Sequence, residues 1–169
     1  AYFEFVDNDD YETMMDLVRN GHQNIIIART ASKIHGLAGM RVGFGFAHPD
    51  MIQRINGAKT GALNVLGIAA AKASYLDNSF QEFSIRKNRE SLNIAEGMLD
   101  EHGVRYVKSN GNFTFFETGR DVAKLQQEFM AENIMVGRAF PPMTDWLRVS
   151  MAKPAEMRYF VQAYKKILG

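Results

Sequence analysis

A short apolar run, Ile25 to Ala28, leads within two residues into a segment of hydroxyl, lysine and glycine side chains. Three consecutive isoleucines predict a strand buried on both faces, as in a parallel sheet covered by helices. After a tight turn, residues Val42 to Ala47 predict a second strand. Two strands cannot by themselves bury both faces of such a sheet. The run therefore predicts an α/β domain that contains more strands than these residues supply.

The second half of the sequence predicts a different arrangement. Residues 80–102 carry apolar side chains among many charges, which indicates one long helix ended by Gly103. Beyond it the order of elements is that of a compact α+β unit, with strands predicted at 104–107, 113–116, 134–136 and 146–150 and helices at 122–133 and 155–168. The only plausible boundary lies within or before the long helix. We therefore expect domains at residues 1–80 and 81–169.

Composition excludes several classes of function. With 20 basic and 19 acidic residues the net charge is +1, so no global field recruits nucleic acid or an anionic membrane. The longest apolar stretch, residues 62–73, is too short and too polar to span a bilayer. The four histidines lack the spacing of a metal site, so no metal is expected. The absence of cysteine fits a reducing cytosol and also a periplasm, and a cytoplasmic location is our expectation.

The segment after the first strand carries residues suited to covalent cofactor chemistry. A lysine held where water is scarce, as predicted for Lys33, has a neutral amine that can condense with an aldehyde. Arg41 lies eight positions later and can bind a phosphate, to which the hydroxyls of Thr30 and Ser32 can also donate. Pyridoxal 5′-phosphate offers an aldehyde and a phosphate together. The segment therefore predicts a site for this cofactor.

The same segment, Ser32-Lys33-x-x-Gly-Leu-Ala-Gly-x-Arg41-x-Gly, resembles the lysine signature of class I/II aminotransferases. The first five residues resemble the end of the Asp-Glu-Ala-Tyr-x-Glu-Phe segment of histidinol-phosphate aminotransferases. The resemblance implies that Lys33 forms the Schiff base and that the Tyr2 hydroxyl donates to the cofactor's ring oxygen. It also implies a homodimer. The aspartate of that family segment would precede Ala1, so we expect this chain to be the C-terminal part of an aminotransferase.

The resemblance also implies a fold. It is the α/β architecture of fold type I among pyridoxal-phosphate-dependent transferases. Residues 1–80 would form the C-terminal part of the large cofactor-binding domain, including the end of its sheet. Residues 81–169 would form the small α+β C-terminal domain.

Three further residues resemble substrate-binding positions of the family. Arg148, in the run Trp146 to Met151, corresponds to an arginine that receives the substrate's α-carboxylate as a two-pronged pair. Arg138 resembles an arginine that helps to hold the substrate phosphate in histidinol-phosphate enzymes, although Gly137 is inserted beside it. Asn112 matches a family position near the substrate. The resemblance thus places the substrate-binding residues in the second half of the chain.

Taken together, these motifs predict an aminotransferase that moves an amino group between an L-amino acid, histidinol-phosphate-like or other, and a 2-oxo acid. Two alternatives remain open at this point. A decarboxylase or lyase on the same fold uses the same lysine and arginine to break a different bond. A non-catalytic aminotransferase-like module would bind the cofactor without turnover.

Overall fold

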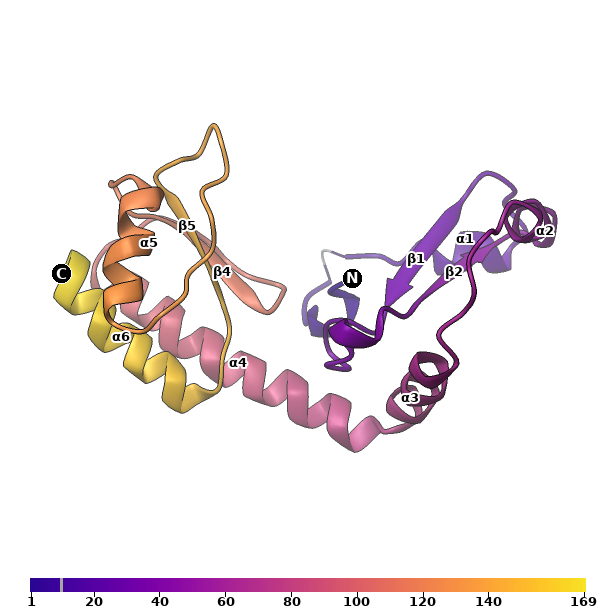
Figure 1. The fold of residues 1–169 in the computed structure, drawn as a ribbon, viewed down its shortest axis with the longest axis horizontal. Helices are drawn as coiled ribbons and strands as arrows, with labels where there is room; N and C mark the ends of the chain where they lie inside the picture. The colour runs from indigo at the N-terminus through magenta and orange to yellow at the C-terminus, as the bar shows by residue number, and fades with distance from the viewer. Residues whose placement is uncertain (10) are drawn as a thin grey trace. The chain divides into compact units, whose positions relative to one another are not determined.

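The computed structural model describes residues 1–9 and 11–169, which form two compact units, Ala1–Glu82 and Phe83–Gly169 (Figure 1). The division lies within helix α4 (Asn78–Glu101), close to the boundary predicted between residues 80 and 81. That the two units are the domains of a larger protein stays a prediction. Each unit is described by itself below.

The centre of the first unit is an antiparallel pair of strands, β1 (Ile26–Thr30) and β2 (Gly43–Ala47). The pairing runs from Ile26 opposite Ala47 to Thr30 opposite Gly43. The burial of both faces that the isoleucines predict is absent within the described residues, where Ile26 is 53% exposed. Burial of both faces requires a wider sheet with helices on each side, and in this unit the described residues form only this pair of strands. The remaining elements are η1 (Phe3–Phe5), α1 (Met15–Arg19), η2 (Ala38–Met40), α2 (Pro49–Gly57) and α3 (Val65–Leu76).

The side-chain amide of Asn64, at the start of helix α3, contacts the turn between the two strands. The Asn64 carbonyl oxygen Oδ1 accepts from the Gly67 N–H at 3.1 Å and so caps the helix. The Asn64 amide Nδ2 donates to the Met40 carbonyl at 2.9 Å. Gly67 lies so close that an added Cβ would sit 2.9 Å from the same Met40 oxygen and would collide with Val42. A residue without a side chain at position 67 therefore lets α3 contact the turn.

The second unit encloses a well-filled apolar core. Its sheet has the antiparallel order β3 (Tyr106–Val107), β4 (Phe113–Glu117) and β5 (Trp146–Ser150), as predicted for three of the four strands. Alternate side chains of β4 and β5 point into this core, which is completed by α4, α5 (Val122–Ala131) and α6 (Pro154–Leu168). Its buried members are Ala95, Met98, Leu99, Phe116, Val122, Leu125, Phe129, Val136, Leu147, Val149, Met157, Phe160, Ala163 and Tyr164.

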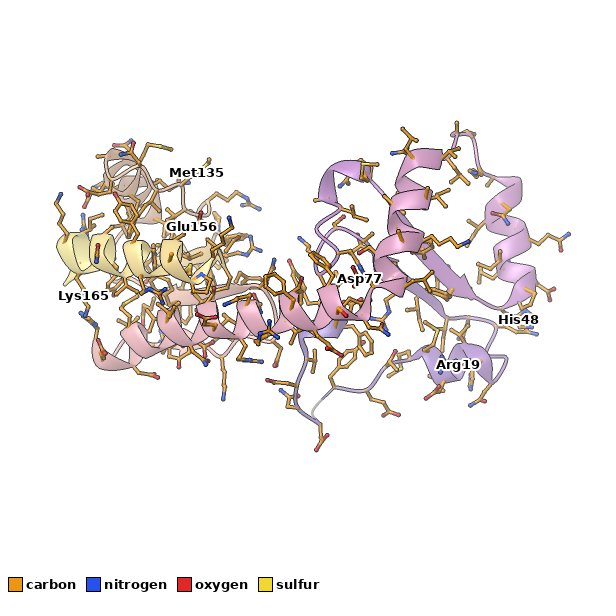
Figure 2. The ribbon with its side chains drawn as sticks, turned by 90° about the horizontal axis from the view of Figure 1, so that it is seen from below. Arg19, His48, Asp77, Met135, Glu156 and Lys165 are labelled. Atoms are coloured by element: carbon orange, nitrogen blue, oxygen red, sulfur yellow. The ribbon has the colours of Figure 1, made fainter. Side chains whose placement is uncertain are left out.

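The strand predicted at residues 134–136 is wrong, because this segment is irregular. It runs beside β5 and is tied to it by a hydrogen bond from the Gly137 N–H to the Arg148 carbonyl, at 2.9 Å. Pro141 and Pro142 follow and have no N–H to extend a ladder of such bonds. The side chain of Met135, labelled in Figure 2, is 84% exposed.

Polar side chains cap the N-termini of several helices. The His48 ring nitrogen Nδ1 accepts from the Asp50 N–H at the start of α2, and an Asp77 oxygen accepts from the Phe80 N–H at the start of α4 (Figure 2). Over residues 1–9 and 11–169, none of the helices combines the length and apolar character that a bilayer crossing requires.

Candidate functional site

Lys33 lies on the turn between β1 and β2, and backbone hydrogen bonds fix the shape of this turn. The Ala31 N–H donates to the Val42 carbonyl at 3.1 Å, which closes the turn at its base. The Leu37 N–H donates to the Ala31 carbonyl at 3.0 Å, and Gly36 adopts a φ of 65°, a conformation that favours glycine. The side chain of Lys33 is partly buried. A defined backbone therefore carries this amine, although the side chain still reaches solvent.

Two hydroxyl groups precede the lysine and are ordered by each other. The Thr30 hydroxyl donates to Ser32 Oγ at 2.8 Å, and the Ser32 N–H donates back to Thr30 Oγ1 at 3.1 Å. Two hydroxyls in this arrangement share one of their two protons, so one proton of the pair is left to donate to an anion. The pair therefore presents one hydroxyl donor immediately before Lys33.

Arg41 ends the same turn in the left-handed region, with a φ of 53°. It directly precedes Val42, and Ser32 directly follows Ala31, so the two residues flank the hydrogen bond that closes the turn. The Arg41 guanidinium is exposed and donates one hydrogen bond, of 3.0 Å, to the Ala38 carbonyl. Its remaining N–H groups suit a phosphate or carboxylate.

The ring of Tyr2 lies beside the lysine. The Lys33 Nζ atom is 5.2 Å from the centroid of the Tyr2 ring, a cation–π contact. Tyr2 immediately precedes η1, so two segments separated by thirty residues of sequence meet here. The structure therefore brings together two residues that the sequence assigns to the cofactor.

The structure adds a histidine that the predicted set of site residues did not include. His35 is only 3% exposed, and its Nδ1 atom lies 2.9 Å from the Ser74 hydroxyl of α3. Its ring stacks on Tyr75, with centroids 3.9 Å apart and planes inclined by 30°. Burial lowers the pKa of His35, against smaller opposing effects of the Glu4 carboxylate and of the Ser74 hydrogen bond. In the sequence, the only feature that could have drawn attention to His35 is its position two residues after Lys33.

Arg148 occupies the middle of β5 in the second unit, opposite Phe115 of β4. Its neighbours Leu147 and Val149 are buried in the core, so Arg148 is on the opposite face of the sheet. The guanidinium carbon lies 4.2 Å from the centroid of the Phe113 ring. Stacking on a ring face holds the planar group in one orientation and leaves its edge for a carboxylate.

Gly137 and Arg138 lie beside this strand. A Cβ added at Gly137 would sit 2.5 Å from the Arg148 carbonyl oxygen, so a side chain there would push the segment away from β5. The exposed Arg138 guanidinium carbon is 4.5 Å from the centroid of the Phe140 ring, and its Nη1 donates to the Ala139 carbonyl at 3.1 Å. The inserted glycine thus sets how close Arg138 comes to the strand that carries Arg148.

Asn112 lies in the turn before β4, where its carbonyl accepts from the Met151 N–H at 2.9 Å. Two polar residues of α4, which the sequence did not single out, hold this turn. The Asn88 amide donates to the Gly111 carbonyl at 2.8 Å, and the buried Glu96 carboxylate accepts from the Ser109 N–H at 3.2 Å. Their partners are distant in sequence, so no local motif marks them.

The site residues predicted from sequence therefore fall into two sets. The first unit carries the proposed cofactor residues Tyr2, Thr30, Ser32, Lys33 and Arg41, and the second carries the proposed substrate residues Asn112, Arg138 and Arg148. The role of each of these residues stays a prediction.

Comparison with known proteins gives consistent matches along the chain. The family model described as aminotransferase class I and II matches residues 1–163. A histidinol-phosphate aminotransferase 2 of Hydrogenovibrio crunogenus is 32% identical over 171 residues, covering 99% of this chain and 46% of that protein. The chain thus spans about half the length of the curated relatives it matches.

Solved structures match as well. A protein of Erwinia carotovora atroseptica, provisionally named a histidinol-phosphate aminotransferase, is 34% identical with a TM-score of 0.94, covering 98% of this chain and 48% of that one. The histidinol-phosphate aminotransferase of Sinorhizobium meliloti, solved in complex with pyridoxal 5′-phosphate, is 25% identical with a TM-score of 0.86, covering 99% of this chain and 47% of that one.

Proposed function

The chain belongs to the class I and II aminotransferases, and from this membership we propose that the protein containing it is a pyridoxal-phosphate-dependent aminotransferase. It moves an amino group between an L-amino acid and a 2-oxo acid. The fold predicted from the sequence is confirmed by the matching structures, because they share the α/β fold type I. The activity, the cofactor and the substrates belong to the whole protein and are part of the proposal.

The observation that carries the proposal is the turn that bears Lys33. An amine, one hydroxyl donor of the Thr30–Ser32 pair and the Arg41 guanidinium lie at one turn, and the Tyr2 ring lies 5.2 Å from the amine. These groups fit a molecule that combines an aldehyde, a flat ring and a phosphate. Lys33 would hold the aldehyde, and Tyr2 would donate to the ring oxygen. Arg41, Ser32 and Thr30 would bind the phosphate.

The cofactor and the side chains would each supply part of the chemistry. When bound, the cofactor supplies an aldehyde that takes up the substrate's amino group and a ring that accepts electrons from the substrate's α-carbon. Arg148 would bind the carboxylate of an amino-acid substrate and so hold its α-carbon in one orientation. The Lys33 amine, once released, would take the proton from that carbon as a general base and would deliver it as a general acid to the carbon derived from the aldehyde, not back to the α-carbon.

Histidinol phosphate is the first amino-group donor to test, since relatives that are about one-third identical carry that name. Arg138 would contact its phosphate, and Asn112 would lie near the substrate. The exposed guanidinium of Arg138, stacked on Phe140, is available for such a contact. A homodimer and a cytoplasmic location complete the proposal. Sedimentation of the purified protein and fractionation of its source cells test these two points.

The decisive experiment is the visible absorbance of the complete polypeptide with pyridoxal 5′-phosphate, compared between the wild type, Lys33→Ala and Lys59→Ala. We expect the band of the lysine-bound cofactor in the wild type and in Lys59→Ala, whose exposed lysine lies outside the site, and its loss in Lys33→Ala. Histidinol phosphate and then amino acids are added in turn with a 2-oxo acid as acceptor. Formation of the matching oxo compound from the donor supports transfer. Release of carbon dioxide would indicate a decarboxylase, and a wild type without any band would refute the assignment.

A further inference from the structure

The turn that carries Lys33 packs against one face of α3. Gly67, Ala71, Ser74 and Tyr75 follow each other at the spacing of a single helical face. Gly67 leaves no room for a Cβ beside Met40 and Val42, and Ala71 is fully buried in a cluster with Ala31 and Val42. These contacts hold the base and the far end of the turn.

His35 makes the directional contacts nearest to the lysine. Its hydrogen bond with the Ser74 hydroxyl fixes the ring's edge, and its stacking on Tyr75 fixes the ring's plane. Tyr75 is held in turn by an edge-to-face contact with Phe44 of β2, at 5.5 Å between centroids. Because His35 is 3% exposed, a single rotamer is packed in place. The chain then has only one residue between this fixed point and Lys33.

The charge state of His35 bears on these contacts. The charged groups that act on this stack are the Glu4 carboxylate of η1 and, toward Tyr75, the Arg29 guanidinium of β1, with Lys33 on the same turn. Burial outweighs Glu4, so the pKa of His35 lies below its usual 6.5 and the ring is neutral at neutral pH. Among the described residues, its Nε2 atom is buried and has no hydrogen-bond partner. A proton added to the ring would place a charge in a buried position between the turn and α3.

We propose that His35, held by Ser74 and Tyr75, is a positioning residue that fixes the Lys33 amine for attachment of the cofactor. This inference rests on the proposed function, because it needs Lys33 to be the residue that binds pyridoxal 5′-phosphate. The histidine itself touches neither the cofactor nor the substrate in this account. It acts by limiting where the backbone of residues 33–35 can lie.

The test measures the rate at which pyridoxal 5′-phosphate attaches to Lys33 in the complete polypeptide freed of cofactor. Borohydride traps the product, and mass spectrometry of the peptides locates it. We expect His35→Ala to attach the cofactor roughly tenfold to hundredfold more slowly, because small errors in the placement of a reacting group have effects of this size. The matched control is His102→Ala, which removes an exposed histidine that contacts Tyr164 in the second unit, and it should attach at the wild-type rate.

Two milder variants separate positioning from general damage. His35→Phe keeps a ring to stack on Tyr75 but loses the bond to Ser74, and Ser74→Ala loses the same bond while keeping the histidine. Both should slow attachment while the melting temperature of the cofactor-free protein stays at the wild-type value. The wild-type rate should also fall at a pH below 6.5, where His35 takes up a proton, and His35→Phe should lack this step.

The outcomes of this test are distinct. If His35→Ala attaches the cofactor at the wild-type rate, the inference is wrong although the proposed function stands. If both milder variants lose rate only in parallel with melting temperature, His35 has a structural role and the inference is again wrong. If the wild type shows no label on Lys33, the proposed function itself fails.

Discussion

The two units differ in how completely they bury their apolar side chains. In Phe83–Gly169, fourteen buried apolar residues form one core, thirteen of them from three helices and two strands and one, Val136, from the irregular segment. In Ala1–Glu82 the buried apolar cluster consists of Ala31, Val42 and Ala71, and large apolar side chains such as Leu66 are 75% exposed. Burial of apolar surface is the main favourable contribution to folding. The comparison teaches that the second unit holds its own stabilising contacts, whereas the first has few of them among the described residues.

Separating the two units gives the largest expected difference. Residues 83–169 alone should unfold in one cooperative transition on heating, because their core lies within the segment. Residues 1–82 alone should show no such transition. Circular dichroism and calorimetry of the two fragments measure this directly. Cooperative unfolding of the first fragment would contradict the comparison.

Shortening a buried side chain in the core of the second unit should have the next largest effect. Phe116 of β4 is fully buried and contacts Tyr164 edge-to-face. Phe116→Ala should lower the free energy of unfolding of the second unit by about 3–5 kcal/mol, from lost burial and the cavity left behind. Val107→Ala is the control, since this side chain is 58% exposed in the same sheet and should change stability by less than about 0.5 kcal/mol. Urea unfolding of residues 83–169 gives both values.

Shortening an exposed apolar side chain of the first unit tests whether other residues cover that side chain in the complete polypeptide. Leu66→Ala should leave the stability of this chain nearly unchanged, because the side chain is 75% exposed. In the complete polypeptide the same change should cost about 2 kcal/mol or more, if other residues cover Leu66 there. Melting curves of both forms provide the measurement. Equal and negligible effects in both would show that this part of the surface stays uncovered.

The smallest expected effect concerns an exposed ion pair at the edge of the second unit's sheet. Two hydrogen bonds of 2.9 Å from the Arg105 guanidinium, with the attraction of its charge, lower the pKa of Glu117 below its usual 4.5. A carboxyl whose pKa is lower in the folded state stabilises the fold above its unfolded pKa and loses this contribution as the pH falls through the folded value. The wild type should therefore lose slightly more stability than Arg105→Gln on acidification below about pH 4.5. Identical acid profiles would show that the pair contributes nothing.

The parts that sequence could predict are those whose signal is local. The run around Lys33 reads as one turn because its amine, hydroxyls and glycines are contiguous, and the structure has that turn between two strands. Arg148 could be placed in a strand because it alternates with apolar neighbours. The role of each predicted site residue is untested and stays a prediction.

The parts that sequence missed depend on partners far along the chain. His35 is fixed by Ser74, thirty-nine positions away, and no periodic pattern links the two. Residues 134–136 have the composition of a strand, but whether they join a ladder is decided by the contact of Gly137 with β5 and by the two prolines beyond. The secondary-structure propensities of neighbouring residues could not predict either contact, because they contain no information on tertiary partners.

The two-sided role of Asn64 has a consequence for the chemical ageing of the protein. Its carbonyl oxygen caps α3 while its amide nitrogen donates to the Met40 carbonyl. Deamidation to aspartate would keep the cap but replace the donor with a second acceptor, facing a carbonyl that cannot donate in return. The repulsion between the new carboxylate and the Met40 carbonyl would act between α3 and the turn that carries Lys33. The replacement of one amide nitrogen by oxygen would thus weaken the contact between α3 and Met40, on the turn that carries Lys33.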